Sequence, residues 1–290
     1  MQRTIQVPSR RQFLQWTGAA ATVAALGPAR AHAADPFGGF RLGLQSYSLR
    51  AYEVEQALEH TRTLGLKYWE AYPKHVPLTT VPAEVAKQKE LLAKYGVTLL
   101  AYGVVPFDAD ETKSRRMFDF AHAIGLRSIS ANPKKSAETF DLLDKLVAEY
   151  DIPIAIHNHG PRADYDKISD VETWTKDRHP LIGACVDTGH FLRSDESPVE
   201  AIERLGARVF GCHLKDVRTV KVEGGQKSTK VMTILGEGDL DILGCLRALR
   251  KHVFDRCLSI EYEENAQNPL SDLETCVEHV RKAAAQLPPS

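Results

Sequence analysis

The chain has 290 residues, of which 43% are hydrophobic and 26% are charged, and its net charge at neutral pH is −1. These values are typical of a folded globular protein and argue against a disordered, collagen-like or coiled-coil chain. A charge so close to zero offers no general basic surface for nucleic acid. The five cysteines include no Cys-x-x-Cys pair and no zinc-ribbon spacing, so we expect most of them to be buried as small apolar residues.

Residues 1–33 have the features of a twin-arginine signal peptide. Arg10 and Arg11 precede an apolar, alanine-rich run over residues 16–26, and the tripeptide Ala-His-Ala at 31–33 follows as a small-x-small cleavage pattern. The run is too short for a comfortable membrane span and is interrupted by glycine and proline. We therefore expect a periplasmic or secreted protein whose partner during export is the twin-arginine translocase. No other segment is long and apolar enough to span a membrane, so we expect the mature protein to be soluble.

Removal of residues 1–33 takes away four arginines and no acidic residue. Of the 37 basic residues 33 remain, beside 38 acidic ones, so the mature chain carries a net charge of −5. Taking 33 from 290 leaves 257 residues, which suits a single (β/α)8 barrel of about 250 residues. We therefore assign residues 34–290 to one domain.

Short β-rich runs alternate with amphipathic helical patterns along the mature chain. The eight predicted strands are Arg41–Tyr47, Tyr68–Ala71, Thr98–Val104, Ser128–Ala131, Ile152–His157, Ile182–Asp187, Val209–Leu214 and Cys257–Tyr262. The predicted helices are Val54–Leu64, Pro82–Lys94, Glu111–Ile124, Ala137–Tyr150, Val171–Lys176, Pro198–Leu205, Asp241–His252 and Leu270–Ala285. Eight such units predict an α/β fold, a single closed (β/α)8 TIM barrel. A doubly wound open sheet is the alternative, but no Gly-x-Gly-x-x-Gly follows the first strand.

The segment Val222–Lys230 is the best candidate for a flexible loop, because it contains Gly224-Gly225. It falls between the seventh and eighth strands, on the face where active sites of barrels lie.

Predicted strands five to eight each end in a residue that can bind a metal: His157, Asp187, His213 and Glu261. The carboxyl ends of all barrel strands meet at one rim. Each residue alone has a structural explanation, such as a hydrogen-bonded histidine or a helix-capping aspartate, but one shared site explains four successive strands. Histidine with carboxylate suits Mn²⁺, Zn²⁺, Fe²⁺ or Co²⁺ rather than Ca²⁺. We predict one divalent ion, with Mn²⁺ and Zn²⁺ favoured.

Further polar residues lie close to these strand ends. Because side chains alternate along a strand, Lys215 shares a face with His213, Glu263 with Glu261, and His159 with His157. Lys215 beside a metal could neutralise a developing oxyanion, although an ion pair with Asp216 or Glu237 is an equal alternative. The first three strands offer further candidates for pocket walls: Gln45, Tyr47, Glu70, Tyr72 and Tyr102.

Several of these motifs resemble one known family. Ile-His-Asn-His, Val-Asp-Thr-Gly-His, Cys-His-Leu-Lys-Asp, Ile-Glu-Tyr-Glu and the run over residues 235–241 are similar to the xylose isomerase-like TIM barrels, the sugar phosphate isomerase/epimerase superfamily. The resemblance covers residues 38–286. It implies that His157, Asp187, His213 and Glu261 hold the divalent metal of that superfamily.

The resemblance also carries one departure. Epimerases of the family usually have glutamate where this chain has His157, and there the two glutamates act as bases on opposite faces of the sugar. Only Glu261 of that pair is present here, so Lys215, His159, His190 or Glu70 would have to supply the second acid or base. The family also includes endonuclease IV-like enzymes with a trinuclear zinc cluster, for which this chain has no obvious ligand set.

Three functions follow from the resemblance. The favoured one is a metal-dependent sugar isomerase or epimerase that removes a proton next to a carbonyl and forms an enediolate. The second is a lyase or hydrolase acting on 3-keto-glycosides, and the third is a non-catalytic periplasmic sugar-binding barrel. Export favours the second over a phosphosugar isomerase. The expected partner is a small-molecule sugar or keto-sugar, and a homo-oligomer remains open.

The catalytic roles are assigned on the same basis. Glu261 is the expected base. Glu263 is expected to bind the substrate and is the alternative base. Lys215 and His190 would bind the substrate oxygens, and His159 would return a proton on the other face. Glu70 and Tyr102 are expected to line the substrate pocket.

Overall fold

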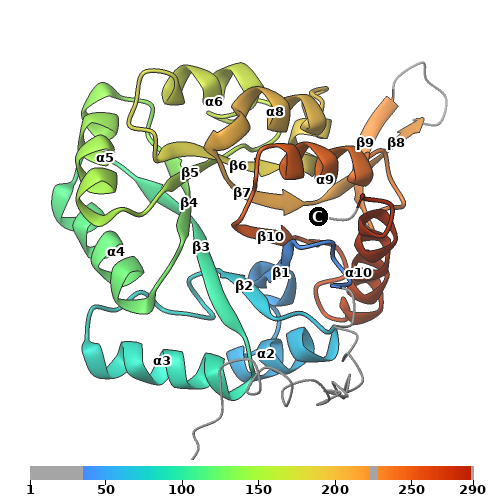
Figure 1. The fold of residues 1–290 in the computed structure, drawn as a ribbon, viewed down its shortest axis with the longest axis horizontal. Coiled ribbons are helices and arrows are strands. Elements are labelled where there is room, and N and C mark those ends of the chain that lie inside the picture. Colours follow the sequence, from blue (N-terminus) through green and yellow to red (C-terminus); the bar gives the residue numbers. More distant parts are fainter. Residues whose placement is uncertain (1–34, 222–227, 289–290) are drawn as a thin grey trace, which may run out of the picture. The chain divides into compact units, whose positions relative to one another are not determined.

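The structure, a computed structural model, describes residues 35–221 and 228–288. Eight parallel strands close into a barrel in the order β1-β10-β7-β6-β5-β4-β3-β2, with helices around it (Figure 1). These strands are β1 (Arg41–Gln45), β2 (Tyr68–Ala71), β3 (Thr98–Phe107), β4 (Ser128–Pro133), β5 (Ile154–His157), β6 (Ile182–Asp187), β7 (Val209–Leu214) and β10 (Cys257–Ile260). The predicted TIM barrel is confirmed, and the alternative of an open sheet is wrong.

The eight predicted helices are all present, with ends that shift by three residues at most. They are α2 (Val54–Thr63), α3 (Pro82–Lys94), α4 (Glu111–Ile124), α5 (Ala137–Tyr150), α6 (Ile168–Thr175), α8 (Pro198–Leu205), α9 (Ile242–Lys251) and α10 (Leu270–Ala284). The sequence pattern does not predict the short helix α7 (Thr188–Arg193) or the 3₁₀ turns η1 (Ser46–Leu49) and η2 (Gly206–Arg208). Helix α7 begins directly after β6, at the rim that carries the predicted metal ligands.

A separate two-stranded antiparallel hairpin follows β7. It consists of β8 (Asp216–Lys221) and β9 (Ser228–Thr233), which pair from Asp216–Thr233 to Lys221–Ser228, and it projects from the barrel in Figure 1. The predicted flexible loop over 222–230 therefore ends too late, because residues 228–230 belong to β9. Its remaining residues, 222–227, lie outside the described part of the chain.

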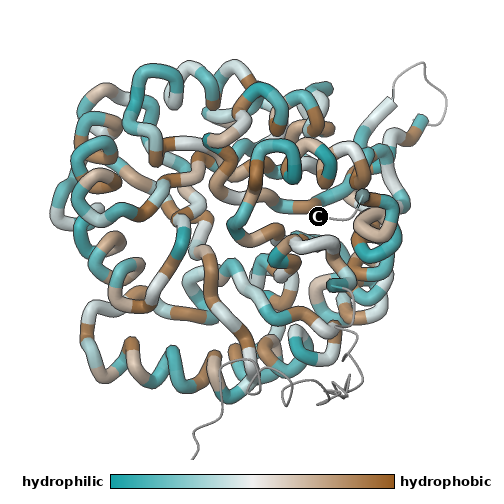
Figure 2. The backbone as a smooth tube through the Cα atoms, viewed as in Figure 1, coloured by the Kyte–Doolittle hydropathy of each residue, from teal (hydrophilic) through white to brown (hydrophobic). Residues whose placement is uncertain are grey.

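The barrel strands are buried on both faces, which explains their apolar sequences. All residues of β5, β6, β7 and β10 are buried, and the strands are mostly brown or white in Figure 2 whereas the helices alternate with teal. Strands covered by helices on one face and by barrel filling on the other must be apolar along most of their length. Polar residues within these strands therefore need a specific explanation.

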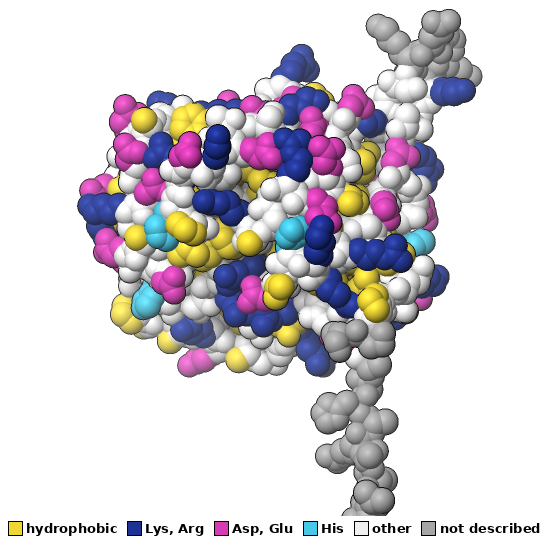
Figure 3. All heavy atoms as spheres, turned by 45° about the horizontal axis from the view of Figure 1, so that its top comes forward, with side chains coloured by type: hydrophobic (Ala, Val, Ile, Leu, Met, Phe, Trp, Pro, Cys, Tyr) yellow, Lys and Arg dark blue, Asp and Glu magenta, His cyan; other side chains and the backbone are white. Residues whose placement is uncertain are grey.

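The remaining surface and cysteine features are simple. All five cysteines are buried and free, as expected. Acidic and basic side chains are both spread over the face shown in Figure 3. Among the residues that the structure describes, no helix is long and apolar enough to cross a membrane. The predicted signal peptide, residues 1–33, lies outside the described residues.

Candidate metal centre

The four predicted metal ligands meet at the carboxyl ends of four neighbouring strands. His157 ends β5, Asp187 ends β6, His213 is the second-last residue of β7, and Glu261 directly follows β10. One nitrogen or oxygen atom of each residue lies within 4.8 Å of the corresponding atoms of the other three. All four side chains are buried, and the most exposed of them, Glu261, is only 8% exposed.

Atom Nδ1 of His213 lies at the centre of this cluster. Its distances are 3.1 Å to Nε2 of His157, 3.1 Å to Oε2 of Glu261 and 3.8 Å to Oδ2 of Asp187. Nε2 of His157 in turn lies 3.4 Å from Oδ2 of Asp187. Two ring nitrogens and two carboxylate oxygens thus converge on one small volume. Such a set of electron-rich atoms is favourable only when protons or a cation lie between them.

Glu70 determines which nitrogen of His213 faces the cluster. Its Oε2 lies 2.9 Å from Nε2 of His213 and accepts a hydrogen bond from the Ser259 hydroxyl at 3.2 Å. With a metal ion in the cluster, His213 would keep its proton on Nε2, toward this carboxylate, and present the Nδ1 lone pair to the ion. Glu70 is fully buried and does not line the cavity. The expectation that it forms a substrate wall is corrected: it supports His213.

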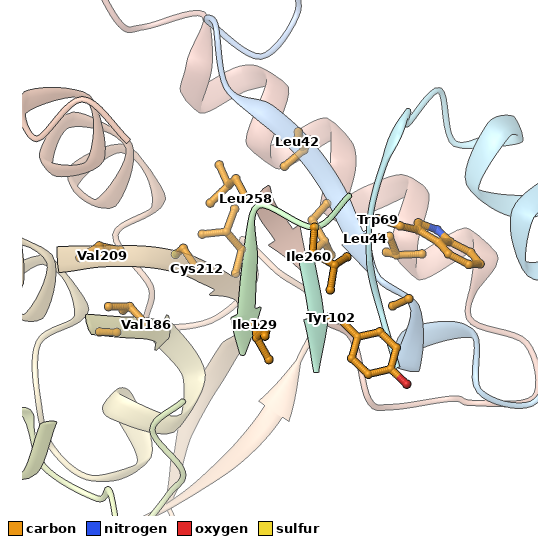
Figure 4. Packing of buried hydrophobic residues seen from close by; sticks show 14 of the residues in the cluster. Leu42, Leu44, Trp69, Tyr102, Ile129, Val186, Val209, Cys212, Leu258 and Ile260 are labelled. Atoms are coloured by element: carbon orange, nitrogen blue, oxygen red, sulfur yellow. The ribbon is translucent and has the colours of Figure 1, made fainter. Parts of the chain in front are cut away.

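Tyr102 is also displaced from its expected role. Its side chain is 1% exposed, and its ring packs against Phe120 of α4 with centroids 5.1 Å apart; Figure 4 shows it among the buried side chains. The next residue, Gly103, lines the cavity instead. Because neighbouring residues of a strand face opposite sides, Tyr102 belongs to the layer between strands and helices and not to the substrate pocket.

Asp187 provides a test of whether a metal fits. Its Oδ1 caps α7 by accepting a hydrogen bond from the backbone N–H of His190 at 2.8 Å, whereas its buried Oδ2 accepts none within the described residues. Burial alone would raise the pKa of Asp187, but the neighbouring imidazoles and the charge of Lys215 hold it well below its usual value. This ionised, buried oxygen accepts no hydrogen bond from the described part of the chain and lies 3.1 Å from the Lys215 ammonium, so its surroundings favour a cation. Two imidazoles and two carboxylates fit Mn²⁺, Zn²⁺ or Fe²⁺.

Lys215 lies against the same carboxylates from the cavity side. Its Nζ is 2.8 Å from Oε2 of Glu261 and 3.1 Å from Oδ2 of Asp187, and it donates a hydrogen bond to Oε1 of Glu263. Burial would lower the pKa of Lys215, but the Asp187 and Glu261 carboxylates raise it above its usual value, so the ammonium is charged. Gly189 makes room for this side chain, since an added Cβ there would lie 2.7 Å from Cγ of Lys215.

The alternative partners proposed for Lys215 are engaged elsewhere. Asp216 accepts hydrogen bonds from backbone N–H groups of the segment over residues 236–240, and Glu237 pairs with Arg218 at 3.5 Å. The interpretation of Lys215 as an ion-pair partner of Asp216 or Glu237 is therefore wrong. Lys215 faces the site because it lies two residues after His213, and alternate residues of an extended chain point to the same side.

A cavity of about 360 Å³ opens beside the cluster. It is lined by Gln45, Tyr47, Tyr72, Pro73, Gly103, Val104, His157, His159, His190, Lys215, Glu261 and Glu263. The rings of His159 and His190 lie with centroids 5.0 Å apart. Burial lowers the pKa of His159, and it lowers the pKa of His190 to about 4. Both imidazoles are therefore neutral near pH 7 and can each donate one proton and accept another.

Two neighbouring side chains, Lys215 and His213, keep Glu261 ionised. Burial would raise its pKa, but Lys215 and then His213 lower the pKa below the usual range. Both contacts involve Oε2. The carboxylate is therefore ionised at the edge of the cavity, beside neutral and cationic proton donors.

Asn158 is a buried residue beside the cluster that the sequence analysis does not single out. Its amide donates to the carbonyl of Asp187 at 3.0 Å, and its Oδ1 accepts from the N–H of Asp187 at 2.8 Å. This pair of hydrogen bonds ties the end of β5 to the end of β6 and so sets His157 beside Asp187. The available signal was a fully polar His-Asn-His run directly after an apolar strand.

Comparison with known proteins is consistent with this geometry. A family model described as xylose isomerase-like TIM barrel matches residues 58–283, and one described as a twin-arginine translocation pathway signal sequence matches residues 7–27. The chain is 25% identical over 260 residues to an inosose dehydratase of Clostridium botulinum, covering 74% of this chain and 85% of that protein. It is 28% identical over 169 residues to a 3-oxo-isoapionate decarboxylase of Pectobacterium atrosepticum, covering 55% and 59%.

Solved structures show the same fold. An uncharacterised protein from Parabacteroides distasonis aligns with a TM-score of 0.63 and 26% identity, over 84% of this chain and 99% of that one. A xylose isomerase-like TIM barrel protein from Mycobacterium smegmatis, solved in complex with magnesium, aligns with a TM-score of 0.64 and 13% identity, over 81% and 90%.

Proposed function

The chain belongs to the xylose isomerase-like TIM barrel family, and from this premise we propose that it is a divalent-metal-dependent lyase for polyhydroxylated ketones. In this reaction a C–H bond next to the carbonyl breaks and its proton goes to the enzyme. The electron pair forms a carbon–carbon double bond as a carbon–oxygen bond one position further along breaks. The departing oxygen takes a proton and leaves as water or as an alcohol.

The observation that carries this proposal is the asymmetry of the acid–base groups. Glu261 is the ionised carboxylate beside the cluster, whereas the position on β5 opposite it holds His157. Two opposed glutamates would suit exchange of a proton between two faces of a sugar. One carboxylate, Glu261, can take the proton from carbon and return it to a leaving oxygen, while the neutral His159 and His190 donate hydrogen bonds to the substrate oxygens. The names of the relatives, dehydratases above all, support the same chemistry.

We assign His157, Asp187, His213 and Glu261 to the metal. When bound, a divalent ion would polarise the ketone and stabilise the negative charge that develops on its oxygen. Glu70 keeps the His213 ring in place, and the Asn158 bonds keep β5 and β6 in register at the site.

The remaining residues act on protons and substrate oxygens. Oε2 of Glu261 contacts Lys215 and His213, so we assign its other oxygen, Oε1, to the substrate proton, with Glu263 as the alternative base. The lowered pKa of Glu261 makes it a weak base, so removal of the proton depends on polarisation of the carbonyl. Lys215 and His190 donate to the carbonyl oxygen, and His159 donates to the departing one.

An isomerase or epimerase is the second candidate, because it shares the first step. The pair of neutral imidazoles, His159 and His190, favours it, since either ring could return the proton to a neighbouring carbon. The two reactions differ only in whether a carbon–oxygen bond breaks.

The signal at residues 7–27 supports export to the periplasm or beyond. Sugar phosphates are mainly cytoplasmic, so we propose that the substrate is an unphosphorylated keto-sugar, keto-cyclitol or 3-keto-glycoside.

Product analysis in deuterated water tests this proposal. The mature protein, loaded with Mn²⁺ or Zn²⁺, is incubated with free ketohexoses, an inosose and a 3-keto-glucoside. A lyase releases water or the aglycone and forms an unsaturated product. Solvent deuterium in an intact sugar, with no unsaturated product formed at all, identifies an isomerase or epimerase and contradicts the lyase. Substrate binding without either change identifies a sugar-binding barrel and contradicts both enzymes.

A further inference from the structure

Arg193 lies outside the cavity but contacts a residue that lines it. It is the last residue of α7, and its Nη1 lies 3.1 Å from Nδ1 of His190. A guanidinium group is always charged and can only donate hydrogen bonds. Nδ1 of His190 must therefore be the acceptor, and a neutral His190 carries its single proton on Nε2.

The other edge of the same ring faces a second cation. Nε2 of His190 lies 3.4 Å from Nζ of Lys215, and an ammonium group also only donates. The two cations therefore compete for the one lone pair of the neutral imidazole. The shorter contact belongs to Arg193, so the lone pair points to Arg193 and the Nε2–H points toward Lys215 and the cavity.

The Nε2–H of His190 then has no acceptor among the described residues, because its neighbour is the Lys215 ammonium, which already contacts Asp187, Glu261 and Glu263. Both His190 and Lys215 line the cavity, and His190 is only 7% exposed. We propose that Arg193 is a positioning residue that holds His190 in the Nε2–H tautomer, so that His190 and Lys215 together donate to one substrate oxygen. The inference rests on the proposed function for the nature of that oxygen, which is the carbonyl oxygen that gains charge in the reaction.

The chain makes room for this contact at Gly160. A Cβ added to Gly160 would lie 2.9 Å from both Cζ and Nη1 of Arg193. The guanidinium thus occupies the space that a side chain at position 160 would need. The φ angle of Gly160 is not in the left-handed region. Alanine at position 160 would therefore displace the flexible end of Arg193 without straining the backbone.

Nitrogen-15 NMR of the imidazole rings measures the tautomer without any substrate. The experiment uses the mature protein loaded with diamagnetic Zn²⁺ at pH 7, with His190 assigned by loss of its signals in His190→Gln. In the wild type we expect a pyridine-type shift at Nδ1 and a pyrrole-type shift at Nε2 of His190. In Arg193→Leu the two types should exchange places, because Lys215 then takes the lone pair at Nε2.

Two further variants keep the test decisive if Arg193→Leu fails to fold. Gly160→Ala should shift the tautomer in the same direction, and Arg193→Lys should retain the wild-type pattern because it keeps a donor near Nδ1. Lys230→Met is the matched control: it removes another cation from the surface around Arg193 and should leave both His190 shifts unchanged.

Kinetics then connect the tautomer to turnover. Once a substrate is known, loss of the second donor should lower kcat of Arg193→Leu by about 10²-fold with a smaller change in KM, and Arg193→Lys should recover most of it. A proton on Nδ1 of His190 in the wild type would overturn the inference, as would unchanged shifts in both Arg193→Leu and Gly160→Ala. These shifts do not depend on substrate, so they are informative even if the protein proves not to be a lyase.

Discussion

The two oxygens of Asp187 have different tasks. Oδ1 caps α7, and Oδ2 faces the two histidines. The hydrogen bond that Oδ1 accepts fixes the orientation of the carboxylate, and in this orientation Oδ2 points toward His157 and His213. A substitution at this residue therefore disturbs a helix end and a ligand set together. Residues that support only one of these tasks are more informative to change.

Glu70 is such a residue, and its replacement is the first prediction. Glu70→Gln keeps the size of the side chain but removes the carboxylate that faces Nε2 of His213. Because the partner of a metal-binding histidine raises its basicity and fixes its tautomer, we expect Zn²⁺ affinity to fall by about 10- to 100-fold. Calorimetric titration of the metal-free protein measures this change. Ser259→Ala, which removes a weaker neighbour of Glu70, serves as the control, and an unchanged affinity in Glu70→Gln would show that Glu70 does not support a metal ligand.

The second prediction concerns the pH dependence of stability in the metal-free protein. Burial lowers the pKa of His157 and of His190 to about 4 in the folded chain, whereas an unfolded histidine titrates near 6.5. Between these values the unfolded state binds more protons, so stability falls as the pH falls from about 6.5 to about 4. Each histidine contributes a slope of about 1.4 kcal/mol per pH unit. Urea unfolding of His190→Gln should show a slope smaller by this amount, and an equal slope would mean that His190 titrates normally.

At this scale the sequence predicts some residues well and others poorly. His157, Asp187, His213 and Glu261 stand at the ends of strands, where position along the chain determines position on the rim. Lys215 and Glu263 follow from the alternation of side chains. Glu70 and Tyr102 are misjudged, because the sequence does not reveal how deep in the barrel a residue lies or whether its strand is shifted in register, as occurs between β2 and β3. Asn158 contacts Asp187, which is distant in the sequence, and Arg193 contacts His190 through a short helix that the sequence pattern does not predict.

At the level of elements, the hairpin β8–β9 depends on one buried carboxylate. Asp216 accepts hydrogen bonds from the backbone N–H groups of Val217, Gly236, Gly238 and Leu240, at 2.8 to 3.0 Å. Gly238 has no room for a side chain, because its Cβ would lie 2.4 Å from Oδ1 of Asp216. The carboxylate therefore joins the first residues of β8 to the segment that leads into α9.

The third prediction follows from this anchor. Asp216→Ala leaves several buried donors without a partner, so we expect the free energy of unfolding to fall by about 3 kcal/mol. Urea denaturation measures the loss. Asp239→Ala is the matched control, because Asp239 is exposed and accepts hydrogen bonds only from Thr219 among the described contacts; its effect should stay below about 1 kcal/mol. Equal effects in the two variants would contradict the anchoring role of Asp216.

The regular elements are predictable from the sequence, and the irregular ones are not. The barrel strands are apolar on both faces and the helices have long amphipathic patterns, so both give clear periodic signals. Helix α7 has only six residues and shares its first turn with the metal-binding motif. Strand β9 has no buried residue, so its sequence lacks the alternation that marks a half-buried strand. Helix α7 nevertheless borders the site, because its His190 lines the cavity.

For the whole molecule, the N-terminal signal bears on the compartment in which the protein acts. The fourth prediction is that replacing both Arg10 and Arg11 by lysine stops transport, because the twin-arginine pair is the recognition signal. Cell fractionation should then find the uncleaved chain in the cytoplasm. In the wild type, N-terminal sequencing of the exported protein should begin at Ala34. Arg30→Lys, a change of the same type outside the pair, should be exported normally, and normal export of the double variant would contradict the assignment.

The barrel, the residues at its rim and the signal support the proposed function, in which the exported protein would act on a free ketone. The proposed function requires that Glu261 remove a proton from the carbon next to a carbonyl. The site cluster, the cavity and the proton donors all adjoin this one carboxylate, so its replacement distinguishes the account from a barrel that only binds sugars.

The most direct measurement is exchange of the substrate's α-proton with deuterated solvent, followed by NMR for the wild type and Glu261→Gln, with the metal content of each sample determined in parallel. The account predicts exchange in the wild type and a loss of at least about 10²-fold in Glu261→Gln, while the variant still holds its ion and binds the substrate within about tenfold of the wild type. Near-normal exchange in a Glu261→Gln sample that retains its metal would contradict the account.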